Sequence, residues 1–264
     1  MTNGLPWPGG QPALTTPNTN HHLEQMAQAL FKSWFIDFEP FLDGDFIYSE
    51  LGEIPVGWQV VPLNDVATFT SGYSYKSAEL QESTTAMVTI KNFQRKGGFK
   101  SEGFKEIAIS GKTKPAQFLN KFDIIVAHTD LTQNADVVGN AELLMSDGGY
   151  EKLIISLDLV KVEEKTDFPH FLLAALLKSP QFKSHALGFV NGTTVLHLSK
   201  KALPEYRVAL PEDLSAVANV SSALEAMYRQ IARNNGENER LAKLRDSLLP
   251  RLMSGELSVA GLSG

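Results

Sequence analysis

Residues 90–100, IKNFQRKGGFK, concentrate side chains that can read nucleic acid. Arginine presents a fork of donors to guanine, asparagine and glutamine pair with adenine, and lysine neutralises phosphate. Two adjacent glycines would let the backbone approach a ligand closely. An ordinary basic hairpin turn has the same composition, so both interpretations stay open for this stretch taken alone. The candidate contacts here are Lys91, Asn92, Gln94, Arg95, Lys96 and Lys100.

Two more stretches place polar side chains after a predicted strand. The first, TDLTQN at 129–134, offers two amides and two hydroxyls, but Asp130 would repel phosphate. In the second, residues 191–201, a Gly-Thr-Thr turn suits the closing of a strand, so its amide, imidazole and lysines are the better candidates. The candidate contacts in the two stretches are Thr132, Gln133, Asn134, Asn191, His197, Lys200 and Lys201.

The formal net charge of −6 conceals two basic segments. Residues 76–121 hold nine basic and four acidic residues, and residues 171–201 hold four basic and no acidic residues. Two such segments in an acidic protein suit one phosphate-facing surface if they meet in the fold. Two separate solvated faces account for the same counts equally well.

Signatures of catalysis are scarce in this sequence. The Asn-Pro-Pro-aromatic motif of adenine methyltransferases and the glycine-rich nucleotide-binding loops do not occur, and the histidines lack metal-ligand spacing. Asp158, Glu163 and Lys165 loosely imitate the carboxylate–lysine arrangement of Mg²⁺-dependent nucleases, although their segment reads as a strand that enters a charged turn. We therefore expect a protein without a catalytic site, a cofactor or a metal of its own.

Composition limits the broad class of the protein. The chain has 264 residues, of which 43% are hydrophobic, so it can bury a core. It contains no cysteine, which excludes a disulfide framework and fits a reducing compartment. No apolar run is long enough to span a bilayer, and the first residues lack a secretory signal. These features predict a cytoplasmic protein.

The loops must be held by regular elements, and the first of these is a helix. Residues 1–17 are rich in proline and glycine and predict a flexible leader. Leu23, Met26, Leu30 and Trp34 recur at helical spacing and predict a short N-terminal helix within 18–40. Residues 41–57 are acidic and punctuated by glycine, which predicts a connection.

A β-rich domain is predicted over residues 58–210. Short apolar or β-branched runs, among them 66–69, 107–109 and 123–127, alternate with glycine-containing polar loops. Residues 169–177 and 180–187 each begin with a proline, which is typical of a helix start. The predicted fold class is α+β, with a mixed and mostly antiparallel domain between a short N-terminal and a long C-terminal helix.

A long coiled-coil helix is predicted over 211–254, followed by a tail at 255–264. Its apolar residues repeat every seven positions, whereas Asn234, Gly236 and Asn238 weaken the middle, so a hairpin of two helices is the alternative. Pro250 should bend or end the helix. The apolar stripe needs a cover, because each buried leucine stabilises by about 1.5–3 kcal/mol. The predicted oligomer or partner seam comprises Val217, Leu224, Ile231, Leu241, Leu248 and Leu252.

Several of these segments together resemble one known family. LEQMAQALFKSWFIDFEP at 23–40, followed by GEIPVGWQVVPLNDVATFTSGYSYK at 52–76, resembles the junction between a conserved helix and a target recognition domain in DNA specificity subunits of type I restriction-modification systems. LAKLRDSLLPRLMSGELSV at 241–259 is similar to the C-terminal conserved region of these subunits. DIIVAHT at 123–129 and NGTTVLHLS at 191–199 match a strand block and a turn of the family.

The resemblance implies a non-enzymatic protein that reads one half of a bipartite DNA target. It also implies docking of adenine methyltransferase subunits and of restriction-translocase subunits, with S-adenosylmethionine, Mg²⁺ and ATP bound by those partners. Family members of full length have two recognition domains and two long helices, so the chain looks like a half-size or truncated form. We accordingly expect a homodimer with antiparallel long helices. A metal-dependent nuclease and a coiled-coil scaffold without DNA contact remain as alternatives.

Overall fold

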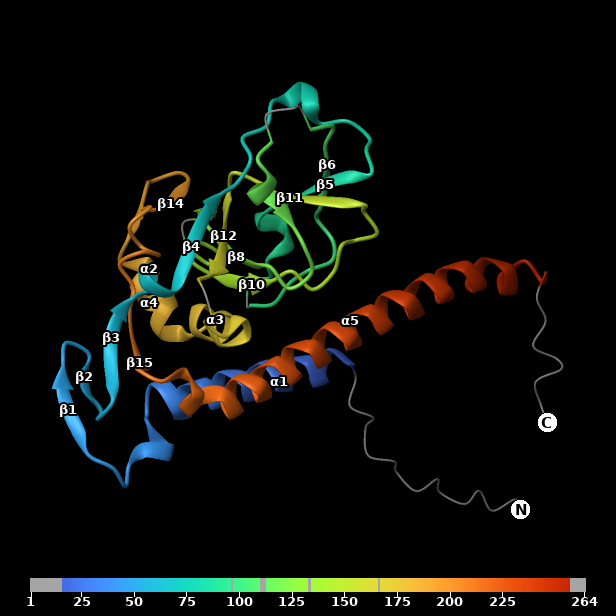
Figure 1. The fold of residues 1–264 in the computed structure, drawn as a ribbon. Coiled ribbons are helices and arrows are strands. Elements are labelled where there is room, and N and C mark those ends of the chain that lie inside the picture. The colour runs from blue at the N-terminus through green and yellow to red at the C-terminus, as the bar shows by residue number, and fades with distance from the viewer. Residues whose placement is uncertain (1–15, 96, 110–112, 133, 166, 257–264) are drawn as a thin grey trace, which may run out of the picture.

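The computed structural model describes residues 16–95, 97–109, 113–132, 134–165 and 167–256. It consists of a β-rich body, helices packed on one side of that body, and a long helix that projects beyond it (Figure 1). This arrangement confirms the predicted α+β class. The predicted flexible leader and tail fall almost entirely outside the described residues. Within the described ranges, no helix is long and apolar enough to cross a membrane.

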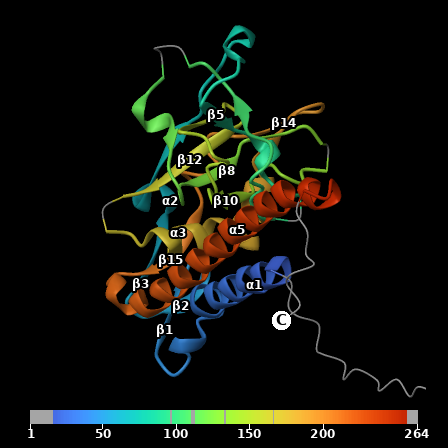
Figure 2. The same cartoon turned by 90° about the vertical axis from the view of Figure 1, so that its right-hand side faces the viewer.

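The predicted N-terminal helix is α1 (Thr16–Phe35), and it runs antiparallel to the first half of α5 (Ala218–Met253), as Figures 1 and 2 show. Ala27, Phe31 and Phe35 form its buried face, at the spacing of one side of a helix. The amide groups of Asn20 and Asn235 pair at 2.7 Å near the start of α1. The helix therefore covers α5 only as far as about residue 235.

Residues 41–57 form more than the predicted connection. After the short 3₁₀ helix η1 (Glu39–Phe41), strands β1 (Phe46–Ser49) and β2 (Gly52–Pro55) pair as an antiparallel hairpin. The sequence of these strands has few apolar residues and no clear alternation of apolar and polar side chains. Its acidic and glycine residues are typical of a loop. Gly52 has a φ of 102°, a conformation that glycine adopts readily at such a turn.

Two four-stranded sheets form the body of the protein. The first contains, in spatial order, β10 (Ala141–Leu143), β8 (Ile124–Ala127), β12 (Leu159–Glu164) and β4 (Ala67–Ser71). The second contains β6 (Lys105–Glu106), β5 (Thr85–Val88), β11 (Lys152–Ile155) and β7 (Phe118–Leu119). β5 and β11 are parallel, and the other named strand pairs in the described ranges are antiparallel, as predicted.

Strand β8 explains why the body has two apolar layers. Ile124 and Val126 belong to the core that includes the helices, whereas Ile125 and Ala127 belong to the core between the two sheets. Successive side chains of a strand point to opposite faces, so a strand that is buried on both sides reads as a continuous apolar run. The predicted strand at 107–109 is wrong, because pairing in that region is confined to β6.

Smaller elements complete the body. A three-stranded sheet contains β13 (Val190–Asn191), β14 (Leu196–Leu198) and β9 (Thr129–Asp130), and β3 (Trp58–Pro62) pairs with β15 (Arg207–Pro211). The short helices are α2 (Leu63–Val66), α3 (His170–Leu177), α4 (Pro180–Leu187), η2 (Ser77–Glu79), η3 (Ile90–Asn92), η4 (Pro115–Gln117) and η5 (Leu214–Val217). The two predicted helices after Pro169 and Pro180 are thereby confirmed. The first part of the strand predicted at 66–69 is instead the end of α2.

Helix α5 is continuous, so the alternative of a helical hairpin is wrong. It begins later than predicted, because Pro211 belongs to β15 and a 3₁₀ turn comes before the helix. Pro250 lies within the last turn, and the helix ends at Met253. The loss of one backbone donor is therefore tolerated close to the C-terminus.

The predicted seam divides into two parts. Val217, Leu224 and Ile231 are buried in the core of the chain itself, so their assignment to an oligomer or partner contact is wrong. The helices that cover them belong to this chain, and a heptad pattern does not distinguish such a cover from another molecule. Beyond the end of α1, Leu241 is 47% exposed and Leu252 is 40% exposed, with Leu248 half-buried.

Candidate nucleic-acid interface

Residues 90–95 and 97–102 form the two arms of a basic hairpin, joined by a bridge between Phe93 and Phe99. Its turn is closed by hydrogen bonds from Gln94 N–H to the Gly98 carbonyl at 2.9 Å and from Gly97 N–H to the Gln94 carbonyl at 3.1 Å. The two glycines have φ values of 88° and 106°, which side chains rarely tolerate. This turn carries Arg95 on its exposed tip. Lys96, also predicted as a contact, lies outside the described residues.

The prediction that Asn92 contacts DNA is wrong, because its side chain is fully buried. Its Nδ2 donates to the Lys100 carbonyl at 3.2 Å and to the Glu102 carbonyl at 3.1 Å, and its Oδ1 accepts from Thr89 N–H at 2.9 Å. The amide that appeared suited to adenine thus holds the two arms of the basic hairpin together.

Asp130 organises the second predicted loop. Its side chain is buried and accepts hydrogen bonds from the N–H groups of Val137 at 2.6 Å and Val138 at 3.2 Å. The N–H and hydroxyl of Thr132 each donate to it at 2.8 Å. Burial alone would raise the pKa of Asp130, but these donors outweigh it and lower the pKa below its usual value. The carboxylate is therefore compensated inside the loop.

The remaining residues of this loop differ in their availability. Thr132 is half-buried and its hydroxyl donates a hydrogen bond to Asp130, whereas Asn134 is exposed. Gln133 lies outside the described residues. Leu131 is 69% exposed, and sequence reasoning missed it. A single apolar residue within a polar loop was the available signal, since apolar side chains contact the thymine methyl group.

The third predicted loop lies directly beside the second. Strand β14 pairs His197 with Thr129 on one side and with Asn191 on the other, and both His197 and Asn191 are exposed. Burial lowers the pKa of the neighbouring His128, and its electrostatic interactions with His197 and Lys200 lower it further, whereas Asp158 raises it. The lowered pKa favours the neutral form of the His128 ring.

The basic hairpin and the loop at Asp130 form the two walls of one surface pocket of about 430 Å³. The polar residues of the first wall are Lys91, Arg95, Lys100 and Glu102, and the second wall contains Asp130, Leu131 and Thr132. Two segments about 35 residues apart in the sequence thus meet, which composition could not reveal. We call this feature the basic groove.

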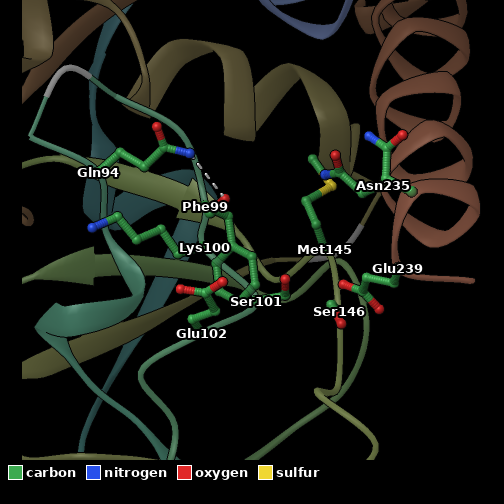
Figure 3. Close-up of a pocket in the computed structure, with 10 residues that line it drawn as sticks. Gln94, Phe99, Lys100, Ser101, Glu102, Met145, Ser146, Asn235 and Glu239 are labelled. Atoms are coloured by element: carbon green, nitrogen blue, oxygen red, sulfur yellow. Dashed lines mark hydrogen bonds between the residues drawn. The ribbon is translucent and has the colours of Figure 1, made fainter. Parts of the chain in front are cut away.

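Gln94 does not belong to the basic groove. It lines a second pocket of about 410 Å³ between the basic hairpin and α5, together with Asn235 and Glu239 (Figure 3). There its Nε2 donates to the Phe99 carbonyl at 3.4 Å. A role for Gln94 in the same contact as Arg95 is therefore not supported.

The second basic segment reaches the surface only in part. Lys178 is buried in an ion pair with Glu142. The Nζ of Lys183 donates to the carbonyls of Ala135 at 3.0 Å and Val138 at 2.6 Å. Lys200 and Lys201 are exposed, and Lys201 lies 4.0 Å from Glu205. The second basic segment therefore brings fewer cations to the surface than its count suggested.

The residues of the nuclease alternative do not converge. Asp158 Oδ1 accepts from the Thr129 hydroxyl at 3.1 Å, Glu163 lies 3.0 Å from Lys161, and Lys165 donates to a backbone carbonyl. Asp158 directly precedes β12 and Glu163 is the penultimate residue of that strand, and five residues of strand span about 16 Å. Within the described part of the chain, no group of three or more His, Asp or Glu side chains is arranged to hold a metal ion.

Comparison with known proteins gives consistent matches. A family model described as the type I restriction modification DNA specificity domain matches residues 55–243. The MjaIX type I restriction enzyme specificity subunit of Methanocaldococcus jannaschii is 29% identical over 248 residues, which cover 92% of this chain and 55% of that protein. The HindI specificity subunit of Haemophilus influenzae is 25% identical over 289 residues, which cover 90% of this chain and 62% of that protein.

A likeness in fold accompanies these matches. The type I restriction-modification S subunit from M. genitalium superimposes with a TM-score of 0.56 at 16% sequence identity, over 90% of this chain and 55% of that one. This likeness concerns the fold alone. The chain spans a little over half the length of the curated relatives it matches.

Proposed function

Because the chain belongs to the family of type I restriction modification DNA specificity domains, we propose that it reads a DNA sequence and has no catalytic activity of its own. The observation that carries this proposal is the basic groove, in which an exposed arginine fork and two lysines face a polar loop. Arg95 is the proposed base reader, and Lys91 and Lys100 are proposed phosphate contacts. Asn134, Asn191, His197, Lys200 and Lys201 extend the proposed contact surface.

A pair of single variants tests this function. Arg95→Lys keeps the charge but removes the fork, so it should relax the preferred sequence at one position by about 1–3 kcal/mol with an unchanged salt dependence. Lys91→Ala should leave the preference unchanged and reduce the salt slope by about one. Selection of bound duplexes from a randomised library, followed by titration at several salt concentrations, measures both quantities.

The matched control for this pair is Arg207→Lys, an exposed arginine at the start of β15 and outside the groove. It should change neither quantity. If Arg95→Lys leaves the selected sequence identical to that of the wild type, Arg95 does not read bases. Equal affinity of the wild type for all sequences would contradict the proposed function as a whole.

The proposed partners are adenine methyltransferase subunits and, in nuclease assemblies, restriction-translocase subunits. Support comes from the relatives, which are named as specificity subunits of type I restriction enzymes. S-adenosylmethionine, Mg²⁺ and ATP would bind in those partners. The proposed compartment is the cytoplasm, since the function requires access to DNA.

Self-association through the free half of α5 is the finer part of the proposal. The exposed leucines of this half lie symmetrically about the point between Asp246 and Ser247, so that position 241 mirrors 252 and position 244 mirrors 249. Two antiparallel copies related by a two-fold axis at this point would bring these leucines together. Such a dimer would present two copies of the basic groove and would read an inverted repeat, each copy contributing one half of a bipartite target.

A further inference from the structure

A buried carboxylate ties the basic hairpin to the helices. Glu142 on β10 is 3% exposed, and its Oε1 accepts the backbone N–H of Gly98 at 2.5 Å. Its Oε2 accepts from Nζ of Lys178, the residue that caps the C-terminus of α3. One side chain thus joins the closing residue of the hairpin turn to a helix end.

The chain of contacts continues to α1. The Nζ of Lys178 lies 3.6 Å from a carboxylate oxygen of Glu24, and its side chain is 10% exposed. Burial would lower the pKa of Lys178, but the two carboxylates outweigh it and raise the pKa, so the ammonium stays charged. Burial raises the pKa of Glu142 despite the opposing effect of Lys178. Removal of one partner would leave the other charge uncompensated in the core.

The hairpin turn depends on this anchor. Gly98 both accepts from Gln94 N–H within the turn and donates to Glu142 in the body. Arg95 lies between the two residues that close the turn, so a shift of Gly98 moves the arginine fork. Base readout by a bidentate fork depends on the position of that fork, because both of its hydrogen bonds must form together.

We infer that Glu142 is a positioning residue for sequence discrimination, and that Lys178 and Glu24 couple the basic hairpin to α1. This inference rests on the proposed function, in which Arg95 reads a base. Helix α1 packs along α5, whose free half is the proposed site of assembly. A displacement of α1 would therefore reach the hairpin through Glu24, Lys178 and Glu142.

Two double variants with the same loss of charge isolate the anchor. Both carry Lys178→Met, which removes the buried ammonium. Glu142→Gln keeps a carbonyl that can accept from Gly98, whereas Glu142→Ala leaves that N–H without its acceptor. The Gln variant should retain the sequence preference of the wild type. In the Ala variant the sequence preference should fall about tenfold. Binding of both variants to random DNA should stay the same, because phosphate contacts supply it.

A second measurement follows the coupling directly and needs only a mild substitution. Glu24→Gln acts on a partly exposed side chain and should move the amide resonance of Gly98 in the NMR spectrum. The control is Asp37→Asn, which removes an exposed ion pair with Lys32 beyond the end of α1 and should leave that resonance in place. Equal sequence preferences in the two double variants would overturn the positioning role.

The arms of the experiment separate the possible failures. An unmoved Gly98 resonance in the Glu24→Gln protein would overturn the coupling to α1, and this arm stands even if the Glu142→Ala double variant does not fold. A wild-type protein that binds all sequences equally would overturn the proposed function instead. The resonance of Gly98 would still report on the anchor in that case.

Discussion

Asp130 is the residue whose replacement should most affect the second wall of the basic groove. Asp130→Asn replaces one acceptor oxygen by a donor that faces N–H groups, so we expect a loss of about 1–3 kcal/mol in the free energy of unfolding at neutral pH. Urea denaturation measures this loss. Asp65→Asn, at an exposed carboxylate in α2, serves as the control and should change stability by less than about 0.5 kcal/mol.

The same substitution has a pH signature. The pKa of Asp130 is lower in the folded protein than its ordinary value of 3.8. Its contribution to stability is therefore fully present above that ordinary value and is lost as the pH falls through the lower, folded pKa. The difference between wild type and Asp130→Asn should narrow in this acidic range. A difference that stays constant across the range would contradict the role of the carboxylate.

Residue types could be predicted from the sequence better than residue roles. Arg95, Lys91 and Lys100 were expected at a surface, and the structure exposes them. Asn92 has an equally suitable side chain, but it is buried and hydrogen-bonded to the backbone of Thr89, Lys100 and Glu102. Which polar side chain turns inward depends on where carbonyl groups lie after folding, and composition does not contain that information.

At the scale of the element, Gly236 tests the continuity of α5. It lies inside the helix with no atom near its position for a β-carbon, so Gly236→Ala should stabilise the protein by roughly 0.5–1 kcal/mol. Thermal unfolding would show this as a higher midpoint. Gly98→Ala is the opposite control, because its φ of 106° should make the same substitution destabilising. A lower midpoint for Gly236→Ala would indicate a break in the helix.

Elements with strong local signals were predictable, and elements defined by their neighbours were not. Helix α4 begins at Pro180, and the Ser179 hydroxyl accepts a hydrogen bond from Phe182 N–H. Adjacent residues therefore determine where this helix begins. The hairpin of β1 and β2 has no comparable signal. The apolar stripe of α5 was visible, yet its first half packs on α1 and the body, since tertiary packing decides what covers a helix.

At the scale of the whole molecule, the free half of α5 predicts the oligomeric state. Leu244→Asp together with Leu249→Asp should convert a dimer to a monomer and leave the body folded, because both positions are exposed in the single chain. Light scattering at micromolar concentration, with circular dichroism as the check on folding, measures this change. Leu42→Asp, at a residue that is 62% exposed and far from α5's free half in the sequence, is the matched control and should leave the dimer intact.

The oligomeric state of the wild-type chain distinguishes a homodimer from docking to a different protein. A monomeric wild-type chain under these conditions would argue against the dimer, and it would leave the leucines as a docking surface for a different protein.

The net charge of −6 did not predict the basic groove. The groove forms where two segments meet in the fold, and a net charge sums over all segments without regard to their positions.

The two-sided strand β8 has a consequence for how such a protein can evolve. Each of its four side chains is committed to one apolar layer or the other, so almost any substitution there disturbs packing. Arg95, Asn134 and Asn191 lie outside both layers. Mutations at these three positions should cost little stability. Substitutions there can therefore change the target sequence while the two apolar layers stay unchanged.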